Sequence, residues 1–181
     1  YDARRNNLGN SILSGLDFNA NYTGDFDFGT LSGGISGTYS FENKTAGSAA
    51  GPFVSIQSVG VPIYAISGFT QLITGPWNLR ASVQFSPGFR VDPNTQAYKL
   101  YAQRHIGSFA TVNFHTGYDL SGVMDILDQT EVGVTVNNLL NADPPIYLHG
   151  GTVLPANSGV GITANGSTIG RYFLLSLQKA F

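Results

Sequence analysis

The segment from Trp77 to Ser86 alternates between apolar and polar side chains at every step, and most of the chain repeats this pattern. Successive side chains of a β-strand point to opposite faces, so the pattern predicts a strand with one apolar and one polar face. Seven segments of this kind are expected to be strands: 10–22, 28–41, 61–73, 77–86, 108–120, 129–140 and a last one ending at residue 181. We therefore expect an all-β protein, essentially without helix.

The polar sides of these segments are unusually uniform. Between residues 28 and 41 one side consists only of small or polar residues, namely Thr30, Ser32, Gly34, Ser36, Thr38 and Ser40. A strand in the core of a soluble protein rarely gives a whole face to such residues. The segment 61–73 is the weakest strand prediction, because apolar residues occur on both of its faces.

The connections between the segments alternate in length. Short turns are expected at 23–26, 74–76 and 121–126, and long loops at 42–60, 87–107 and 142–168. This alternation predicts an antiparallel meander with short turns at one rim and long loops at the other, which is how outer-membrane barrels are organised. Tyr22, Trp77 and Tyr118 are then expected beside the short-turn rim, as part of an aromatic girdle.

Composition excludes several protein classes. Charged residues make up 11% of the chain, well below the quarter that is usual in soluble domains. The absence of cysteine excludes disulfides and thiol catalysis. The net charge of −2 argues against a nucleic-acid partner. No run of 18 apolar residues is present, so a transmembrane helix is not expected.

The end of the chain carries a more specific pattern. VTVNNLLNADPP is followed, after a long Gly-, Asn- and Thr-rich segment, by GRYFLLSLQKAF. This ending resembles that of TonB-dependent receptors, a family with an "NLfN…P" element, a long loop and a final strand of the form "GR…l.l.k.F". The first element is matched by Asn138, Leu139, Leu140 and Asn141, and the second by Gly170, Arg171 and Phe181. Leu140 is a departure, since the family more often has Phe there.

The resemblance implies an antiparallel transmembrane β-barrel segment in the bacterial outer membrane, with about seven meander strands of a barrel of about 22. Residues 1–181 would be the carboxy-terminal portion of the barrel domain, with the plug domain outside this chain. The sequence has no starting Met and no signal peptide, which agrees with a piece of a longer protein. The implied partners are outer-membrane lipid, the plug domain, the TonB complex through the plug region, and the barrel assembly machinery.

The implied function is active uptake of a scarce bulky ligand of the siderophore, cobalamin or carbohydrate class, without a cofactor. Two other classes stay open. One is a passive porin or another plugless barrel, and the other is an outer-membrane enzyme with a site on the lumen or rim. A plug domain encoded upstream would separate the uptake receptor from the porin.

The barrel interpretation assigns one face of each strand to lipid and the other to the lumen. The residues expected to face lipid are Leu79, Val83, Phe85, Val112, Phe114, Val132, Val134, Leu175 and Leu177. Those expected to face the lumen are Arg80, Gln84, Asn113, His115, Glu131 and Gln178, and Asp17 is likewise interpreted as a lumen charge. In the last strand, the resemblance implies an assembly signal made of Phe173, Leu175, Leu177 and Phe181.

The candidate ligand contacts are aromatic and imidazole side chains in the long loops. Tyr98, Tyr101 and His105 belong to one loop, and Tyr147 and His149 to another. They are able to stack on a siderophore, a corrin or a sugar, and the alternative is ordinary loop packing.

Candidates for catalysis or metal binding are few. His105, His115 and His149 lack metal-ligand spacing, so no metal site is assigned. Asn113, His115 and Asp119 share one strand face in a hydrolase-like arrangement, for which the alternative is a hydrated lumen surface. We favour the alternative and predict that the protein is not an enzyme.

Overall fold

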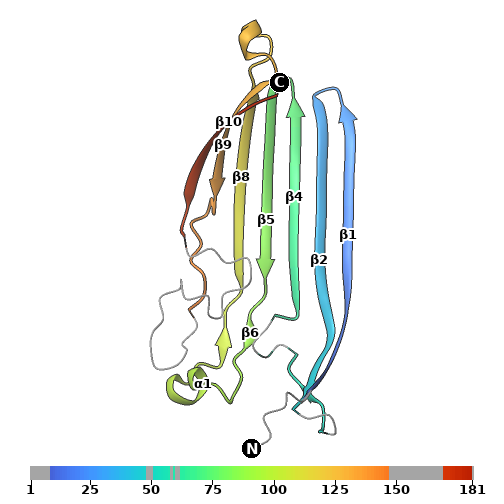
Figure 1. The fold of residues 1–181 in the computed structure, drawn as a ribbon, viewed down its shortest axis with the longest axis vertical. Coiled ribbons are helices and arrows are strands. Elements are labelled where there is room, and N and C mark those ends of the chain that lie inside the picture. The colour runs from blue at the N-terminus through green and yellow to red at the C-terminus, as the bar shows by residue number, and fades with distance from the viewer. Residues whose placement is uncertain (1–8, 48–50, 58, 60–61, 147–168, 181) are drawn as a thin grey trace, which may run out of the picture.

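The fold is known from a computed structural model that describes residues 9–47, 51–57, 59, 62–146 and 169–180. Its main element is a single antiparallel meander sheet, drawn in Figure 1 as long strands lying side by side. The strand order is β1-β2-β4-β5-β8-β9-β10, with β3 paired to β2 as an eighth strand. The bounds are β1 (Asn10–Phe26), β2 (Gly29–Ala46), β3 (Val54–Ser55), β4 (Tyr64–Thr74), β5 (Trp77–Ser86), β8 (Phe109–Asp119), β9 (Thr130–Asn137) and β10 (Tyr172–Lys179). The predicted antiparallel meander is confirmed.

The segment between β5 and β8 was expected to be a plain loop, and this prediction is wrong in part. The strands β6 (Phe89–Arg90) and β7 (His105–Ile106) pair with each other, and the helix α1 (Gln96–Tyr101) lies between them. In Figure 1 these elements lie at the end of the sheet opposite to the turn that joins β8 to β9. That turn contains a short 3₁₀ helix (Asp125–Leu127). Among the described residues helix is thus confined to connections, as expected for a strand protein.

The first hairpin turns later than predicted. The strand β1 continues through residues 23–26, and the turn consists of Asp27 and Phe28. Gly29 provides the backbone for this turn, with φ +135°, and a Cβ on it would clash with the carbonyl oxygen of Ile73. The Gly and Asp residues of 23–27 predicted an early turn, but cross-strand pairing of β1 with β2 extends the strand past them.

Because the turn comes later, the prediction that Tyr22 lies beside the short-turn rim is wrong. Tyr22 pairs with Gly33, which through Thr70 aligns with Ala81, four residues along β5 from Trp77. Tyr22 is therefore not beside the rim. The rim residue of β1 is Phe26, whose ring stacks on Phe28 with centroids 5.1 Å apart.

Other strand limits differ by a few residues. The strand β2 continues to Ala46 and pairs with β3, so the predicted loop 42–60 is partly strand. A register shift between Ser14 and Gly15 leaves Phe41 as an extra residue of β2, which is a β-bulge. Three further predicted strands, 61–73, 108–120 and 129–140, correspond to β4, β8 and β9. Each of the three ends at its carboxy-terminal side in a turn.

The cross-strand register places the two predicted residue sets on opposite faces. Leu79 aligns with Thr116, Val134 and Leu175, whereas Arg80 aligns with His115 and Thr135. Directly paired residues share a face. By this register all nine residues expected to be on the apolar face lie together, and the six polar ones lie on the other face.

The apolar face of the sheet is exposed. On the edge strand β10 the side chains of Leu175, Leu177 and Phe173 are 84%, 71% and 66% exposed, and on the inner strands Val83 and Val132 are 41% and 42% exposed. Within the described part of the chain, the buried hydrophobic cluster lies in the segment between β5 and β8 instead, where Phe89, Val91, Ala97 and Ile106 pack together. The sheet is therefore a single layer whose apolar face has no covering layer among these residues.

Candidate functional site

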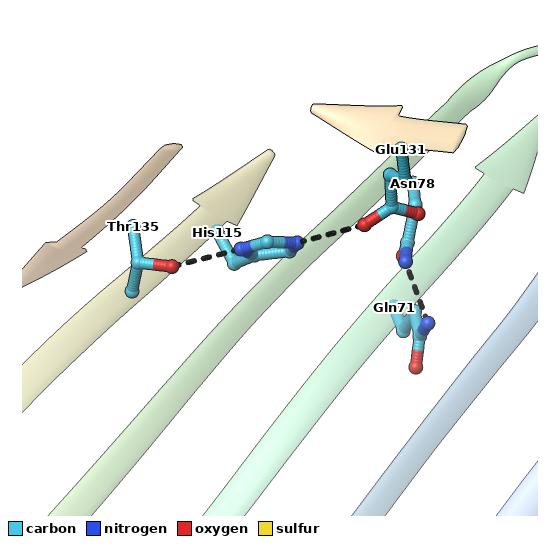
Figure 2. A network of polar contacts seen from close by, with 5 residues as sticks. All are labelled: Gln71, Asn78, His115, Glu131 and Thr135. Atoms are coloured by element: carbon cyan, nitrogen blue, oxygen red, sulfur yellow. Dashed lines mark hydrogen bonds and ion pairs between the residues drawn. The ribbon is translucent and has the colours of Figure 1, made fainter. Parts of the chain in front are cut away.

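The polar face carries a network centred on His115 of β8, shown in Figure 2. Its Nδ1 lies 2.8 Å from the hydroxyl oxygen of Thr135 on β9. Its Nε2 lies 3.8 Å from the Oε1 atom of Glu131, also on β9, so the two form an ion pair when the imidazole is protonated. Both side chains are about one-third exposed or less. The two contacts fix the plane of the ring.

Two glycines make this approach possible. Gly117 and Gly133 are cross-strand partners and lie in the row between the His115–Thr135 pair and the Asp119–Glu131 pair. A Cβ on Gly117 would lie 2.6 Å from the Glu131 carboxylate, and one on Gly133 would lie 2.9 Å from the His115 ring. His115 and Glu131 therefore meet diagonally across two paired glycines, which have no side chains.

A second part of the polar face surrounds Arg80 of β5. Its Nη1 donates to Oε1 of Gln71 at 3.0 Å, and Gln71 Nε2 in turn donates to Oδ1 of Asn78 at 2.8 Å. The guanidinium carbon also lies 4.0 Å from the centre of the Phe69 ring, a cation–π geometry. The Phe69 ring has room on the polar face because its partner on β2 is Gly34.

The hydrolase-like arrangement of Asn113, His115 and Asp119 does not form. Asn113 Oδ1 accepts the backbone N–H of Asn138, and Asp119 Oδ1 accepts that of Ser121. His115 and Asp119 are four residues apart on one strand, which is about 13 Å at the rise of a β-strand. Across the residues that the structure describes, no group of three or more His, Cys, Asp or Glu side chains is placed to hold a metal ion.

The asparagines of the NNLLN element form a junction at the end of β9. Asn138 is 3% exposed and has φ +52°, a left-handed conformation that asparagine tolerates better than most residues. Its side chain accepts from Ala142 N at 2.8 Å and donates to Ala142 O at 2.9 Å. Its own backbone N–H donates to Asn113 on β8. One residue thereby ends the strand, closes the turn and attaches it to the neighbouring strand.

Asn141 connects the two halves of the carboxy-terminal pattern. It also has φ +52°, and its Oδ1 accepts the backbone N–H of Arg171 at 2.8 Å. A Cβ on Gly170 would lie 2.9 Å from the same oxygen, so glycine provides the space. In the sequence analysis these residues were identified only as parts of a resemblance. The signal for their role was the preference of asparagine for turns and left-handed backbone.

The loop candidates divide into packed and exposed side chains. Tyr98 packs against the buried cluster of Phe89, Val91, Ala97 and Ile106, with the Arg104 guanidinium 4.1 Å from its ring centre and bonded to its hydroxyl. Tyr101 is 38% exposed at the end of α1, and His105 is exposed on β7, where Gly88 leaves room for its ring. Tyr147 and His149 lie outside the described residues, so their position relative to this group stays a prediction.

The last strand presents its predicted apolar set on one face. Phe173, Leu175 and Leu177 pair with Val136, Val134 and Val132 of β9. Lys179 continues this face, and its Nζ donates to the carbonyl oxygen of Ile126 at 2.5 Å, which places the charge at the short turn. Phe181, the remaining member of the predicted signal, lies outside the described residues.

In the described residues no helix is long and apolar enough to cross a membrane. No family model matches the chain. No curated protein and no solved structure matches it either.

Proposed function

We propose that this chain is part of the carboxy-terminal wall of a TonB-dependent receptor in a bacterial outer membrane, which takes up a scarce bulky ligand. The observation that carries the proposal is the single-layer sheet with one apolar, exposed face and one polar face. In water such a face is unfavourable by about 25 cal/mol for every Å² of apolar surface. Lipid removes this cost without a second protein layer.

The dimensions of the sheet support a membrane location. The strands β4, β5 and β8 have 11, 10 and 11 residues, and a tilted transmembrane strand needs about 9–11. At the short-turn end, Trp77 and Tyr118 form a cross-strand pair with ring centroids 4.8 Å apart. Trp77 is exposed and Tyr118 is half-buried, and amphipathic rings of this kind at the end of a strand are typical of the membrane–water interface.

One end of the sheet has short turns and the other has long connections, and in an uptake receptor the long connections would contact the ligand. The connection between β5 and β8 has its own buried cluster, and Gln103 Nε2 donates to the carbonyl oxygen of Ile146 beyond β9 at 2.8 Å. Two long connections thus meet at one end of the sheet. Tyr101 and His105 are exposed there, and they are the ligand contacts that we propose.

The TonB-dependent class, as distinct from a porin, rests on the carboxy-terminal pattern. Its two halves make one physical unit, because Asn141 binds the backbone of Arg171. The polar face also suits contact with a protein plug, since Arg80 and His115 are held by neighbouring side chains. A wide channel lined by freely hydrated charges needs no such fixation.

The location is tested by expressing the protein and separating the membranes. We expect it in the outer membrane, resistant to carbonate extraction, with a heat-modifiable mobility in gels. Recovery as a folded protein in the soluble fraction would refute a membrane location.

The transport function is tested by uptake of radiolabelled siderophores, cobalamin and oligosaccharides. We expect saturable uptake of one of these classes that is lost in cells without TonB and in cells treated with an uncoupler. Uptake that persists without TonB and rises linearly with external ligand would support the passive porin instead.

A further inference from the structure

The polar face has an open depression of about 260 Å³ beside Arg80. Apart from Arg80, its lining is uncharged: the hydrogen-bonding side chains of Asn19, Asn21, Ser36, Ser67, Ser82 and Gln84 lie among apolar residues and glycines. These residues come from β1, β2, β4 and β5, so the depression follows the polar face across four strands. Among the described residues that line it, Arg80 is the single charged one.

Arg80 is held in position before any ligand binds. Phe69 covers one face of the guanidinium, and Gln71 accepts one of its N–H groups. Gln71 cannot turn its amide without losing the bond to Asn78, so its oxygen stays directed at Arg80. A guanidinium fixed in this way loses little conformational entropy when it binds a planar anion.

The charge of Arg80 is not matched by a carboxylate in the described part of the chain. The ion pairs there join Lys44 to Glu42 and His115 to Glu131. The direct partner of Arg80 on β8 is His115, which is not an anion. Of the several N–H donors of a guanidinium, only one is accepted by a described residue, Gln71.

We propose that the depression beside Arg80 binds a carboxylate group. The planar guanidinium fork matches the two oxygens of a carboxylate, and the surrounding hydroxyl and amide groups supply further hydrogen bonds. A single cation among neutral groups suits a monoanion better than a phosphate with two charges. The carboxylate belongs either to an acidic side chain of a polypeptide segment lying on the polar face or to a soluble ligand.

The carboxylate site depends on the geometry of the polar face and not on the membrane assignment. It therefore holds or fails separately from the uptake function. The folded protein is to be studied in lipid nanodiscs if it fractionates with membranes, and otherwise in buffer.

The experiment is NMR on protein with labelled arginine and with ¹³C-labelled Asp and Glu carboxyl groups. The signal of Arg80 is assigned from the Arg80→Lys spectrum, or by through-bond correlation if this variant does not fold. A dipolar contact between the guanidinium and a labelled carboxyl carbon shows a carboxylate supplied by the protein. Without that contact, a saturable shift of the Arg80 signal on adding sodium acetate, but not sodium chloride, shows an open site for a soluble carboxylate.

Arg90 is the control, because it is exposed on β6 and its signal is expected to show neither effect. If acetate binds, Arg80→Lys should weaken its binding about tenfold, which corresponds to the loss of one charge-assisted hydrogen bond and is followed on the line width of ¹³C-labelled acetate, because the variant has no Arg80 signal. An Arg80 signal with no carboxyl contact and no saturable acetate shift, or one that behaves like the Arg90 signal, would overturn the proposal.

Discussion

His115 and Glu131 approach each other on the polar face over a row formed by two glycines, with 3.8 Å between Nε2 and Oε1. His115 is paired with Thr135 and Glu131 with Asp119, so the contact between His115 and Glu131 is diagonal. It depends on the space that the missing side chains of Gly117 and Gly133 leave. The two side chains with the adjacent Thr135 connect β8 to β9 in addition to the backbone ladder.

The first prediction concerns that space. Gly133→Ala should destabilise the folded protein by about 1–3 kcal/mol, because the new Cβ meets Ser176 Oγ at 2.6 Å and the His115 ring at 2.9 Å. Denaturant unfolding measures the change. Gly33→Ala is the matched in-strand control, since its nearest heavy atom would be Phe69 O at 3.4 Å. Equal effects of the two substitutions would show that the glycine row is not required.

The second prediction concerns the junction after β9. Asn138→Ala should cost about 2 kcal/mol, because it removes two side-chain hydrogen bonds and places alanine at φ +52°. Asn138→Gly removes the same bonds without the backbone strain and should cost less. Unfolding free energies of both variants decide this, with the exposed Leu140→Ala as the control. An Asn138→Gly variant less stable than Asn138→Ala would contradict the role of the left-handed backbone.

The third prediction tests which face meets lipid. Arg at Val134 should cost about 2–4 kcal/mol if this position lies near the bilayer midplane, because an arginine there must leave water. Arg at the neighbouring Thr135, on the polar face, should cost much less. Reversible folding into lipid vesicles gives both values. Similar costs at the two positions would contradict the assignment of the apolar face to lipid.

The fourth prediction separates the connection between β5 and β8 from the sheet. Ile106 is 1% exposed in the buried cluster, so Ile106→Ala should destabilise that cluster by about 2–5 kcal/mol. Hydrogen exchange should become faster in residues 89–106 and stay unchanged in β4 and β5. Uniformly faster exchange in the sheet would mean that the connection and the strands unfold together.

The fifth prediction concerns assembly. Deleting Phe181 should lower the amount of folded protein in the outer membrane, since the proposed insertion signal ends on this aromatic residue. Deleting an aromatic residue from a connection, such as Phe53, which is 44% exposed, is the control. Normal assembly without Phe181 would remove the signal role but leave the fold unaffected.

The sequence alone determined the seven long strands of the meander, their antiparallel order and which residues share a face. These properties follow from alternation over whole segments such as Trp77–Ser86, where a one-residue error would exchange the faces completely. The same reasoning found the three short turns as elements, but it placed the first one too early. A local Gly–Asp signal at 23–27 competes there with pairing along β2, and only the ladder between the strands decides the outcome.

Only the tertiary structure decided how residues distant in the sequence meet. The His115–Glu131 diagonal requires two glycines on different strands to be partners, and the Asn141–Arg171 bond joins positions 30 residues apart. The folded connection around Ile106 was not predicted either, because its β6, α1 and β7 are each too short to show a period. Alternation in the sequence shows on which side of a strand a residue lies. These contacts depend instead on the register between strands, which is set only when the strands pair.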